Sequence, residues 1–222
     1  MKKSLIALVV SAALLSACGG SDEKNQAPIL TADAATTLND SVITVDVLAN
    51  DSDPDGDALT ISAVGTPDIG DVVITNNTLV YTPSAQAMGD VSFSYEVTDG
   101  ELSTSSTVTI TNQQSVTITG IATDAPINNG EITATNDNGD VVASATTDSN
   151  GTYSLPILVS EDPGYLVLNA NGVGDQAHVS LMSRVGDFLD LRALASENDT
   201  TELSDALLLE SKITHVSTAL SI

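Results

Sequence analysis

The residues with the clearest chemistry lie in one short acidic segment, Asn50-Asp51-Ser52-Asp53-Pro54-Asp55-Gly56-Asp57. Its four aspartates stand at alternate positions, and two such charges 4 Å apart repel each other by about 1 kcal/mol even in water. The segment is therefore costly unless a cation lies among its carboxylates. Carboxylate oxygens that converge around a glycine bend are the ligands that calcium prefers. The sequence thus predicts a calcium site formed by Asp51, Asp53, Asp55 and Asp57.

Other metals and another calcium motif fit this segment less well. Magnesium demands stricter geometry than a pliable loop provides, and zinc prefers Cys and His, which are absent nearby. An EF-hand loop that begins at Asp51 would need a bidentate glutamate at its last ligand position, where Ser62 stands. The alternative to a metal site is a solvated acidic turn, because Pro and Gly are common turn residues.

The sequence around this segment predicts the strands that position it. Residues Val91 to Val97 alternate apolar and polar side chains without a break, which places one apolar face on a core. Shorter runs of the same kind are Val42 to Leu48, Leu59 to Val64, Val72 to Thr75, Leu79 to Thr82 and Thr107 to Thr111. Two packed sheets bury such strands better than one sheet. We therefore expect a mainly β fold, with a β-sandwich over residues 28–112.

This predicted sandwich resembles the bacterial cadherin-like, Ig-like repeat of large surface adhesins. The resemblance rests on "VDVLANDSDPDGD" at residues 45–57 and on "YEVTDG" at residues 95–100, and it covers nearly the whole sandwich. It implies a non-catalytic module that binds calcium. The family's calcium positions carry over to Asp53, Asp55 and Asp57, with Asp51 and Asp99 as further ligands. Asp99 directly precedes Gly100, so its alternative role is that of a turn residue.

The pattern of short strands starts again after Asn112-Gln113-Gln114, which predicts a domain boundary there and a second sandwich over residues 115–175. Its expected strands are Val116 to Gly120, Ile132 to Thr135, Val141 to Thr146, Tyr153 to Leu158 and Tyr165 to Asn169. Asn138-Gly139 and Asn150-Gly151 predict hairpin turns. The stretch 120–155 resembles the carboxypeptidase regulatory-like domain, a transthyretin-like sandwich. This resemblance implies a spacer or scaffold.

The C-terminal segment, residues 176–222, has a different pattern. From Ser180 onward apolar residues recur every three to four positions, which predicts a short helical tail. Thr200 or Thr201 is expected to cap a second helix there. The chain ends on an apolar stretch without a cap, which suggests a truncated form of a longer protein.

The N-terminal residues predict export and lipid anchoring. A basic start and the apolar stretch Ser4 to Leu14 are typical of a signal peptide, here residues 1–17. Leu15-Ser16-Ala17-Cys18 resembles the bacterial lipobox, which implies that Cys18 is acylated after cleavage. Lipid chains anchor a protein without a transmembrane helix. Residues 18–27 are then a flexible tether. By the same resemblance, Gly19 after the cysteine favours the outer membrane over the inner one.

The composition narrows the function further. The chain has 30 acidic and 6 basic residues in 222, a formal charge of −24, which excludes nucleic acid as a partner. It lacks the sequence signatures of hydrolase nucleophiles, zinc peptidases and phosphate-binding loops, so we expect no enzyme activity. We expect a lipid-anchored, calcium-binding envelope protein that acts in adhesion or as a spacer, with an unidentified surface protein or glycan as its partner. The alternative is the non-catalytic N-terminal part of a longer secreted hydrolase.

Overall fold

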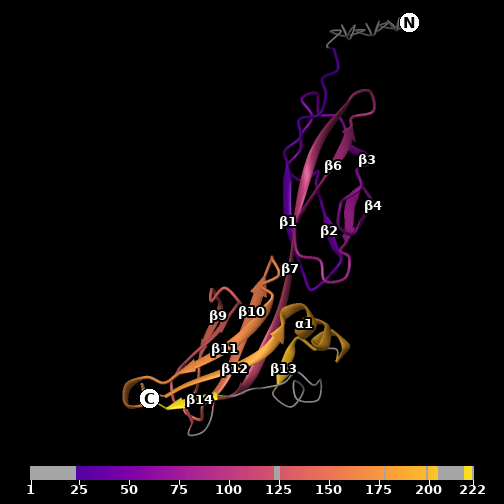
Figure 1. Cartoon of the computed structure of the whole chain (residues 1–222). Coiled ribbons are helices and arrows are strands. Elements are labelled where there is room, and N and C mark those ends of the chain that lie inside the picture. The colour runs from indigo at the N-terminus through magenta and orange to yellow at the C-terminus, as the bar shows by residue number, and fades with distance from the viewer. Residues whose placement is uncertain (1–23, 123–125, 178, 199, 205–217, 222) are drawn as a thin grey trace, which may run out of the picture.

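The structure, a computed structural model, describes residues 24–122, 126–177, 179–198, 200–204 and 218–221. Within these residues the chain forms two β-rich bodies stacked end to end, and one long strand, β7, runs through both (Figure 1). The expected fold class, mainly β with one short helix near the C-terminus, is confirmed. None of the described helices has the length and apolar character needed to cross a membrane.

The first sandwich consists of two sheets. Its strands are β1 (Asp33–Leu38), β2 (Ile43–Val45), β3 (Thr60–Val64), β4 (Asp71–Thr75), β5 (Thr78–Thr82), β6 (Gly89–Thr98) and the first half of β7 (Ser103–Ile121). One sheet has the order β1-β7-β6-β3, with β1 parallel to β7, and the other has the order β2-β5-β4. The core between them contains the stacked rings of Tyr81 and Phe93, whose centroids lie 6.1 Å apart.

Every strand predicted for the first sandwich is present, but one strand was not predicted. The expected strand from Val42 to Leu48 is shortened to β2. Strand β1 has the sequence Asp-Ala-Ala-Thr-Thr-Leu, in which small and polar residues hide the alternation of a half-buried strand. Its place in the sheet comes from six residues paired with β7 and not from its own composition.

The second sandwich contains the remaining elements. They are β8 (Glu131–Thr135), β9 (Val141–Thr146), β10 (Thr152–Val159), β11 (Tyr165–Asn171), the 3-10 helix η1 (Gly174–Gln176), β12 (Val179–Asp187), α1 (Phe188–Glu197), β13 (Glu202–Ser204) and β14 (Thr218–Ser221). One sheet has the order β14-β12-β11-β8-β9, and the second half of β7 pairs with β10 and β13. Helix α1 contributes Phe188 and Leu191 to the core between these layers.

The two predicted hairpin turns have different outcomes. Asn138-Gly139 joins β8 to its antiparallel partner β9, which confirms a hairpin there. The hairpin predicted at Asn150-Gly151 is wrong, because β9 and β10 belong to different sheets and the turn connects the two layers. In both turns only the glycine has a positive φ, 85° at Gly139 and 79° at Gly151.

The helical tail is correct only in part. Residues 188–197 form α1, but the preceding residues form β12, and Leu203 lies in β13 instead of a second helix. Residues four apart share a face in a strand as well as in a helix, so Leu181 and Val185 fit both patterns. Pairing with β11 over residues 165–171 decides for the strand. The rest of the predicted second helix, residues 205–217, lies outside the described residues.

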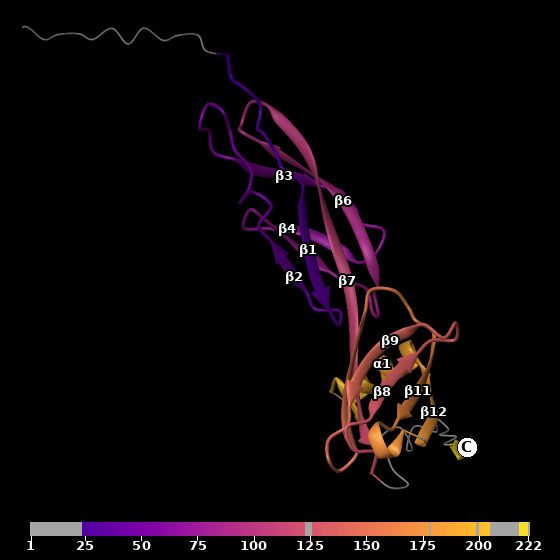
Figure 2. The same cartoon turned by 90° about the vertical axis from the view of Figure 1, so that its left-hand side faces the viewer.

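Strand β7 passes through the predicted domain boundary without interruption (Figure 2). Its buried face continues from Val108 and Ile110 in the first core to Val116 and Ile118 in the second. Between these two pairs the same face carries Asn112 and Gln114, both fully or almost fully buried. Gln113 therefore does not belong to a linker, and no break separates the sandwiches along this strand. The division into domains at residues 112 and 115 stays a prediction.

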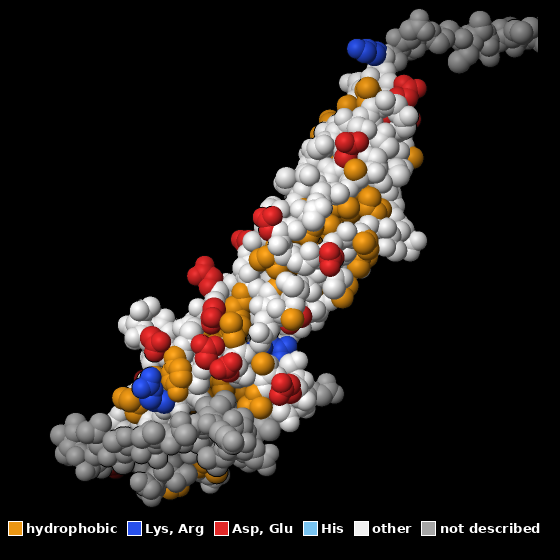
Figure 3. All heavy atoms as spheres, turned by 45° about the vertical axis from the view of Figure 1, so that its right-hand side comes forward, with side chains coloured by type: hydrophobic (Ala, Val, Ile, Leu, Met, Phe, Trp, Pro, Cys, Tyr) orange, Lys and Arg blue, Asp and Glu red, His pale blue; other side chains and the backbone are white. Residues whose placement is uncertain are grey.

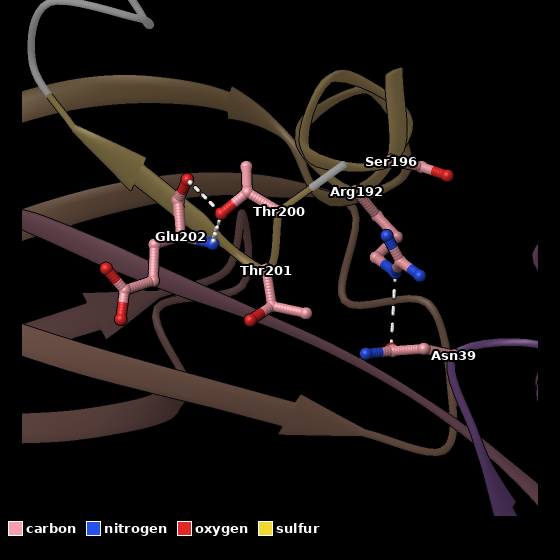
Figure 4. Close-up of a pocket in the computed structure, with 6 residues that line it drawn as sticks. All are labelled: Asn39, Arg192, Ser196, Thr200, Thr201 and Glu202. Carbon is pink, nitrogen blue, oxygen red and sulfur yellow. Dashed lines mark hydrogen bonds between the residues drawn. The ribbon is translucent and has the colours of Figure 1, made fainter. Parts of the chain in front are cut away.

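Polar side chains join the two sandwiches around Gln114, in a region that we call the junction (Asn39, Asp40, Gln86, Gln114, Ser115 and Arg192). Gln114 Nε2 donates to Asp40 Oδ1 at 2.6 Å and to the Ala87 carbonyl at 2.9 Å. The Ser115 backbone N–H donates to Asn39 Oδ1 at 2.7 Å, and this oxygen also accepts from Arg192 Nε at 3.2 Å (Figure 4). Gln86 Nε2 donates to the carbonyl of Leu189 in α1 at 2.9 Å, so the helix of the second sandwich is bonded to a loop of the first.

Candidate functional site

The acidic loop, residues 50–57, folds back on the side chain of Asp53. Asp53 Oδ1 accepts hydrogen bonds from the backbone N–H of Asp55 at 2.8 Å and of Asp57 at 3.2 Å. The Gly56 N–H donates to the Asp53 carbonyl at 3.2 Å, and Gly56 has a φ of 83°, which favours glycine. The loop is therefore held in shape by one carboxylate oxygen, and the second oxygen of Asp53 is left for another partner.

The loop brings three of the predicted ligands together. Carboxylate oxygens of Asp53, Asp55 and Asp57 lie within 4.8 Å of one another. Asp53 Oδ2 is buried and has no hydrogen-bond partner among the described residues. A buried charged oxygen without a partner is expensive, and such groups in native proteins commonly bind an ion or a water molecule. These oxygen donors fit calcium, which takes its ligands from carboxylates, carbonyls and water.

The other two predicted ligands have partners elsewhere. Asp51 Oδ1 accepts from the Thr31 N–H at 2.8 Å, and Asp51 Oδ2 lies 3.5 Å from the Tyr95 hydroxyl. Asp99 Oδ1 accepts from the backbone N–H groups of Leu102 and Glu101, both at 2.7 Å, and these bonds lower the pKa of Asp99. Asp51 and Asp99 therefore fasten backbone segments around the acidic loop, and their role as calcium ligands stays a prediction.

The N-terminal segment of the described chain is bonded to the acidic loop. The Gln26 backbone N–H donates to Asp55 Oδ2 at 2.7 Å, and Gln26 Nε2 donates to Asp55 Oδ1 at 3.2 Å. Asn25 Nδ2 donates to Asp99 Oδ2 at 3.0 Å. Ile29 and Ser52 form an antiparallel bridge with N···O distances of 2.8 and 3.0 Å. Residues 24–31, the acidic loop and the β6–β7 turn thus meet at one end of the first sandwich, which we call the tether pole.

Sequence reasoning did not predict the hydrogen bonds by which Asn25 and Gln26 join this site. Their amide groups are the only local signal, and amides are common in any polar segment. The acidic residues as a whole are not confined to the tether pole, because on the face shown in Figure 3 they are spread along both sandwiches. The scattered carboxylates have the same negative charge as those of the cluster. The cluster is different because its three carboxylates lie close to one another.

A second acidic group lies beside the loop and includes Asp33, which sequence reasoning also missed. The hydroxyl of the buried Tyr95 donates to Asp33 Oδ2 at 2.9 Å. Burial raises the pKa of Asp33, and the charges of Asp51 and Asp46 raise it further, while hydrogen bonds from Tyr95 and Asn50 partly offset this. Burial and the Asp33 carboxylate also raise the pKa of Tyr95, so its hydroxyl remains a donor.

The raised pKa of Asp33 leads to a pH-dependent prediction. The Asp33 carboxyl has a higher pKa in the native state than in the unfolded state, where its pKa is near 3.8. Ionisation of Asp33 in the native state therefore destabilises the fold, and the free energy of unfolding falls as the pH rises above 3.8. Asp33→Asn removes this cost and retains an oxygen for the Tyr95 hydroxyl. We expect the variant to melt a few degrees above the parent chain at pH 7 and together with it at pH 3, in thermal unfolding recorded with chelator present.

Asp71→Asn is the matched control, because it removes the same charge from an exposed position at the start of β4. It should leave the melting temperature almost unchanged at both pH values. A melting temperature of Asp33→Asn at or below that of the parent at pH 7 would show that the Asp33 charge does not destabilise the fold.

Comparison with known families locates a domain of known type in the first sandwich. Residues 25–111 match the family model described as bacterial Ig domain. The first sandwich is an Ig-like domain. The match includes the tether pole from residue 25 onward and ends inside β7, one residue before the buried Asn112 of this strand. The resemblance of residues 120–155 to the carboxypeptidase regulatory-like domain stays a prediction.

Solved structures similar to the chain belong to proteins of several kinds. An endo-fucoidan hydrolase from glycoside hydrolase family 107 is 19% identical, with 77% of this chain and 28% of that chain covered and a TM-score of 0.33. The N-terminal Ig1-2 module of the Drosophila receptor protein tyrosine phosphatase DLAR is 9% identical, with coverage of 68% and 93% and a TM-score of 0.24. The BSP domain of a biofilm associated protein is 17% identical, with coverage of 72% and 27% and a TM-score of 0.21.

The chain thus spans little more than a quarter of the hydrolase chain that it matches. No curated protein sequence is detectably similar to this chain.

The predicted signal peptide, residues 1–17, and the predicted lipid attachment site at Cys18 lie outside the described residues.

Proposed function

We propose that this chain is a non-catalytic protein of the bacterial cell envelope, anchored by lipid at Cys18 in the outer membrane, whose Ig-like domain binds calcium. It projects its second sandwich away from the membrane, as an adhesive element or as a spacer for a partner at the surface. The observation that carries the proposal is the buried Asp53 Oδ2, which has no hydrogen-bond partner among the described residues and lies in a cluster of three carboxylates.

Calcium would be held by Asp53, Asp55 and Asp57, and it would supply positive charge that offsets their mutual repulsion. Asp55 also accepts two hydrogen bonds from Gln26. Calcium that fixes the shape of the acidic loop would therefore also fix the direction in which the tether leaves the first sandwich. Modules that bind calcium outside the cell commonly have dissociation constants of about 10⁻⁴–10⁻³ M. Calcium levels of the surroundings would then decide how firmly the tether is attached to the first sandwich.

The junction supports a role as a spacer. The two sandwiches share the 19 residues of β7, and the buried side chains of Gln114 and Arg192 connect them on one side of this strand. Bending between the sandwiches would break the buried hydrogen bonds that Gln114 forms with the Ala87 carbonyl and with Arg192, and the part-buried bonds from Gln86 to α1 and from Gln114 to Asp40. Such a connection keeps the second sandwich at a constant distance from the tether pole.

Lys24 allows one experiment to test the anchor, the exposure and the calcium effect. It is exposed, it precedes Asn25 directly, and no other lysine occurs between Lys3 and Lys212. A lysine-specific protease added to intact cells is expected to release a fragment that begins at Asn25. Calcium is expected to slow this release several-fold relative to chelator, because an ordered tether is a poor protease substrate. Mass spectrometry of the supernatant identifies the fragment.

Two variants make the result specific. With Cys18→Ser the chain is expected in the medium or periplasm before any protease is added. With Asp53→Asn/Asp55→Asn the release should be as fast in calcium as in chelator. Absence of the fragment from intact cells, with cleavage after lysis, would contradict exposure at the cell surface, and equal rates in calcium and chelator for the parent chain would contradict the ordering of the tether by calcium.

A further inference from the structure

Asparagine followed by glycine occurs four times in the chain, always in the second sandwich. The pairs are Asn129-Gly130, Asn138-Gly139, Asn150-Gly151 and Asn171-Gly172. Because glycine has no side chain, its backbone nitrogen can reach the side-chain carbonyl carbon of the asparagine before it. That attack closes a succinimide ring and releases ammonia, and water then opens the ring to aspartate or isoaspartate. The sequence by itself makes all four asparagines equal candidates for this reaction.

In two of the four pairs the attacking nitrogen is held by a hydrogen bond to a residue several positions away in the chain. The Gly130 N–H donates to Thr147 Oγ1 at 2.9 Å, and Gly130 is buried. The Gly172 N–H donates to the carbonyl of Val179 at 2.9 Å, and a Cβ on Gly172 would collide with the carbonyl oxygen of Gln176. Neither nitrogen can therefore turn toward the asparagine side chain without breaking a contact that the fold imposes.

The other two pairs lie in turns of the same kind, which differ in what surrounds the glycine. In each turn the glycine N–H donates to the carbonyl three residues earlier, at 3.0 Å for Gly139 and at 3.1 Å for Gly151. Gly151 is buried, and a Cβ there would lie 2.8 Å from the Ala122 carbonyl oxygen and 3.2 Å from the Cα of Pro126. Gly139 is exposed, and a Cβ there would meet no atom within 4 Å. The turn at Gly139 can therefore open without disturbing the core.

We infer that Asn138 is a site of spontaneous deamidation and that the fold protects the other three asparagines. The Gly139 nitrogen forms a bond to Cγ of Asn138, and the side-chain nitrogen leaves with the displaced proton as ammonia. Hydrolysis of the succinimide consumes one water molecule and adds a negative charge beside Asp137 and Asp140. Isoaspartate also lengthens the backbone of this turn by a carbon atom.

The position of the turn in the fold allows this change. The turn joins β8 to β9, and β9 is an edge strand of its sheet, so a longer turn leaves the pairing of β8 with β11 in place. We therefore expect the modified chain to stay folded. This inference goes beyond the proposed function, because it concerns the second sandwich and requires neither calcium nor the lipid anchor.

Ageing of the full-length chain in mildly alkaline buffer, once folded and once in urea, tests the inference. A glutamate-specific protease then separates the sites into three peptides, which end at Glu131, Glu161 and Glu197. Mass spectrometry locates each asparagine whose side-chain NH₂ has been replaced by OH. In the folded chain Asn138 is expected to convert at least tenfold faster than any of the other three asparagines. In urea all four should convert at similar rates, because the contacts that protect three of them are lost.

Thr147→Val tests whether the fold protects Asn129 through the hydrogen bond of Gly130. The variant lacks the oxygen that accepts from the Gly130 N–H, so Asn129 should convert several-fold faster than in the parent chain, while Asn138 and Asn150 keep their rates. Unchanged rates at the last two sites also show that the variant is folded. Asn138→Ser is the control for the site itself, and it should remove the isoaspartate that forms in the folded chain.

Three results would overturn the inference. The first is conversion of all four asparagines at equal rates in the folded chain, and the second is faster conversion of Asn150 than of Asn138. The third is an unmodified Asn138 in the folded chain after a period in which it converts completely in urea.

Discussion

Calcium is expected to raise the melting temperature of this chain by several degrees, and the variant Asp53→Asn/Asp55→Asn is expected to lose that rise. A ligand that binds only the native state adds RT ln(1 + [L]/Kd), which at tenfold excess over Kd is about 1.4 kcal/mol or roughly 3–6 °C. The ion acts on the folded chain because only the folded loop brings the oxygens of Asp53, Asp55 and Asp57 within 4.8 Å of one another. Thermal unfolding in calcium, in magnesium and in chelator measures the effect.

Asp137→Asn/Asp140→Asn is the matched control for this prediction. It removes two negative charges from an exposed turn outside the cluster, so it changes the net charge as much as the test variant does. This control should keep the full calcium response, and magnesium should stabilise the parent chain less than calcium. If the parent melts at the same temperature in calcium and in chelator, the acidic loop is a solvated turn and the calcium part of the proposed function is wrong.

Gln114→Ala is expected to lower the free energy of unfolding by about 2–4 kcal/mol, because it deprives several buried groups at the junction of their partners. Gln114 is fully buried, and its side chain bonds Asp40, the Ala87 carbonyl and Arg192 at once. Urea unfolding measures the loss. We also expect a broader distance distribution between spin labels at Thr75→Cys and Ser144→Cys, one on each sandwich, in a Cys18→Ser background.

Gln113→Ala is the control, since it changes the same residue type one position earlier in β7. The Gln113 side chain is on the opposite face of the strand and forms no hydrogen bond with the described residues. Its substitution should cost less than about 0.5 kcal/mol, as surface substitutions usually do, and should leave the spin-label distances unchanged. If Gln114→Ala loses as little stability as the Gln113→Ala control and keeps the same spin-label distances, then β7 alone, without the polar contacts of Gln114, holds the sandwiches in line.

The acidic loop could be predicted from the sequence because its chemistry is local. Asp53, Asp55 and Asp57 are separated by one residue each, and Gly56 allows the bend that turns their carboxylates toward a common centre. The strand from Val91 to Val97 was predictable for the same reason, since its alternation lies within seven consecutive residues. The contacts of Asp33 with Tyr95 and of Gln26 with Asp55 could not be predicted from the sequence, because they link segments that are far apart in the chain.

The boundary between the sandwiches shows the opposite case. Asn112, Gln113 and Gln114 are polar and lie between two apolar patterns, which favoured a domain boundary. The alternation nevertheless continues through them, because Asn112 and Gln114 occupy the same face as Ile110 and Val116. These polar side chains are buried against hydrogen-bond partners from the first residue of β6, the turn after β1, the loop before β6 and α1. Only those distant partners make a buried glutamine favourable.

The sequence by itself determined the mainly β class, most of the strands and the three carboxylates of the acidic loop, because periodicity and turn chemistry act between near neighbours. The tertiary structure alone decided which strands pair, that β7 runs through both sandwiches, and that Arg192 reaches Asn39 across 153 positions of the chain. The physical reason is that the energy of a buried polar or charged group depends on the partners that surround it, and those partners come together only when the chain has folded.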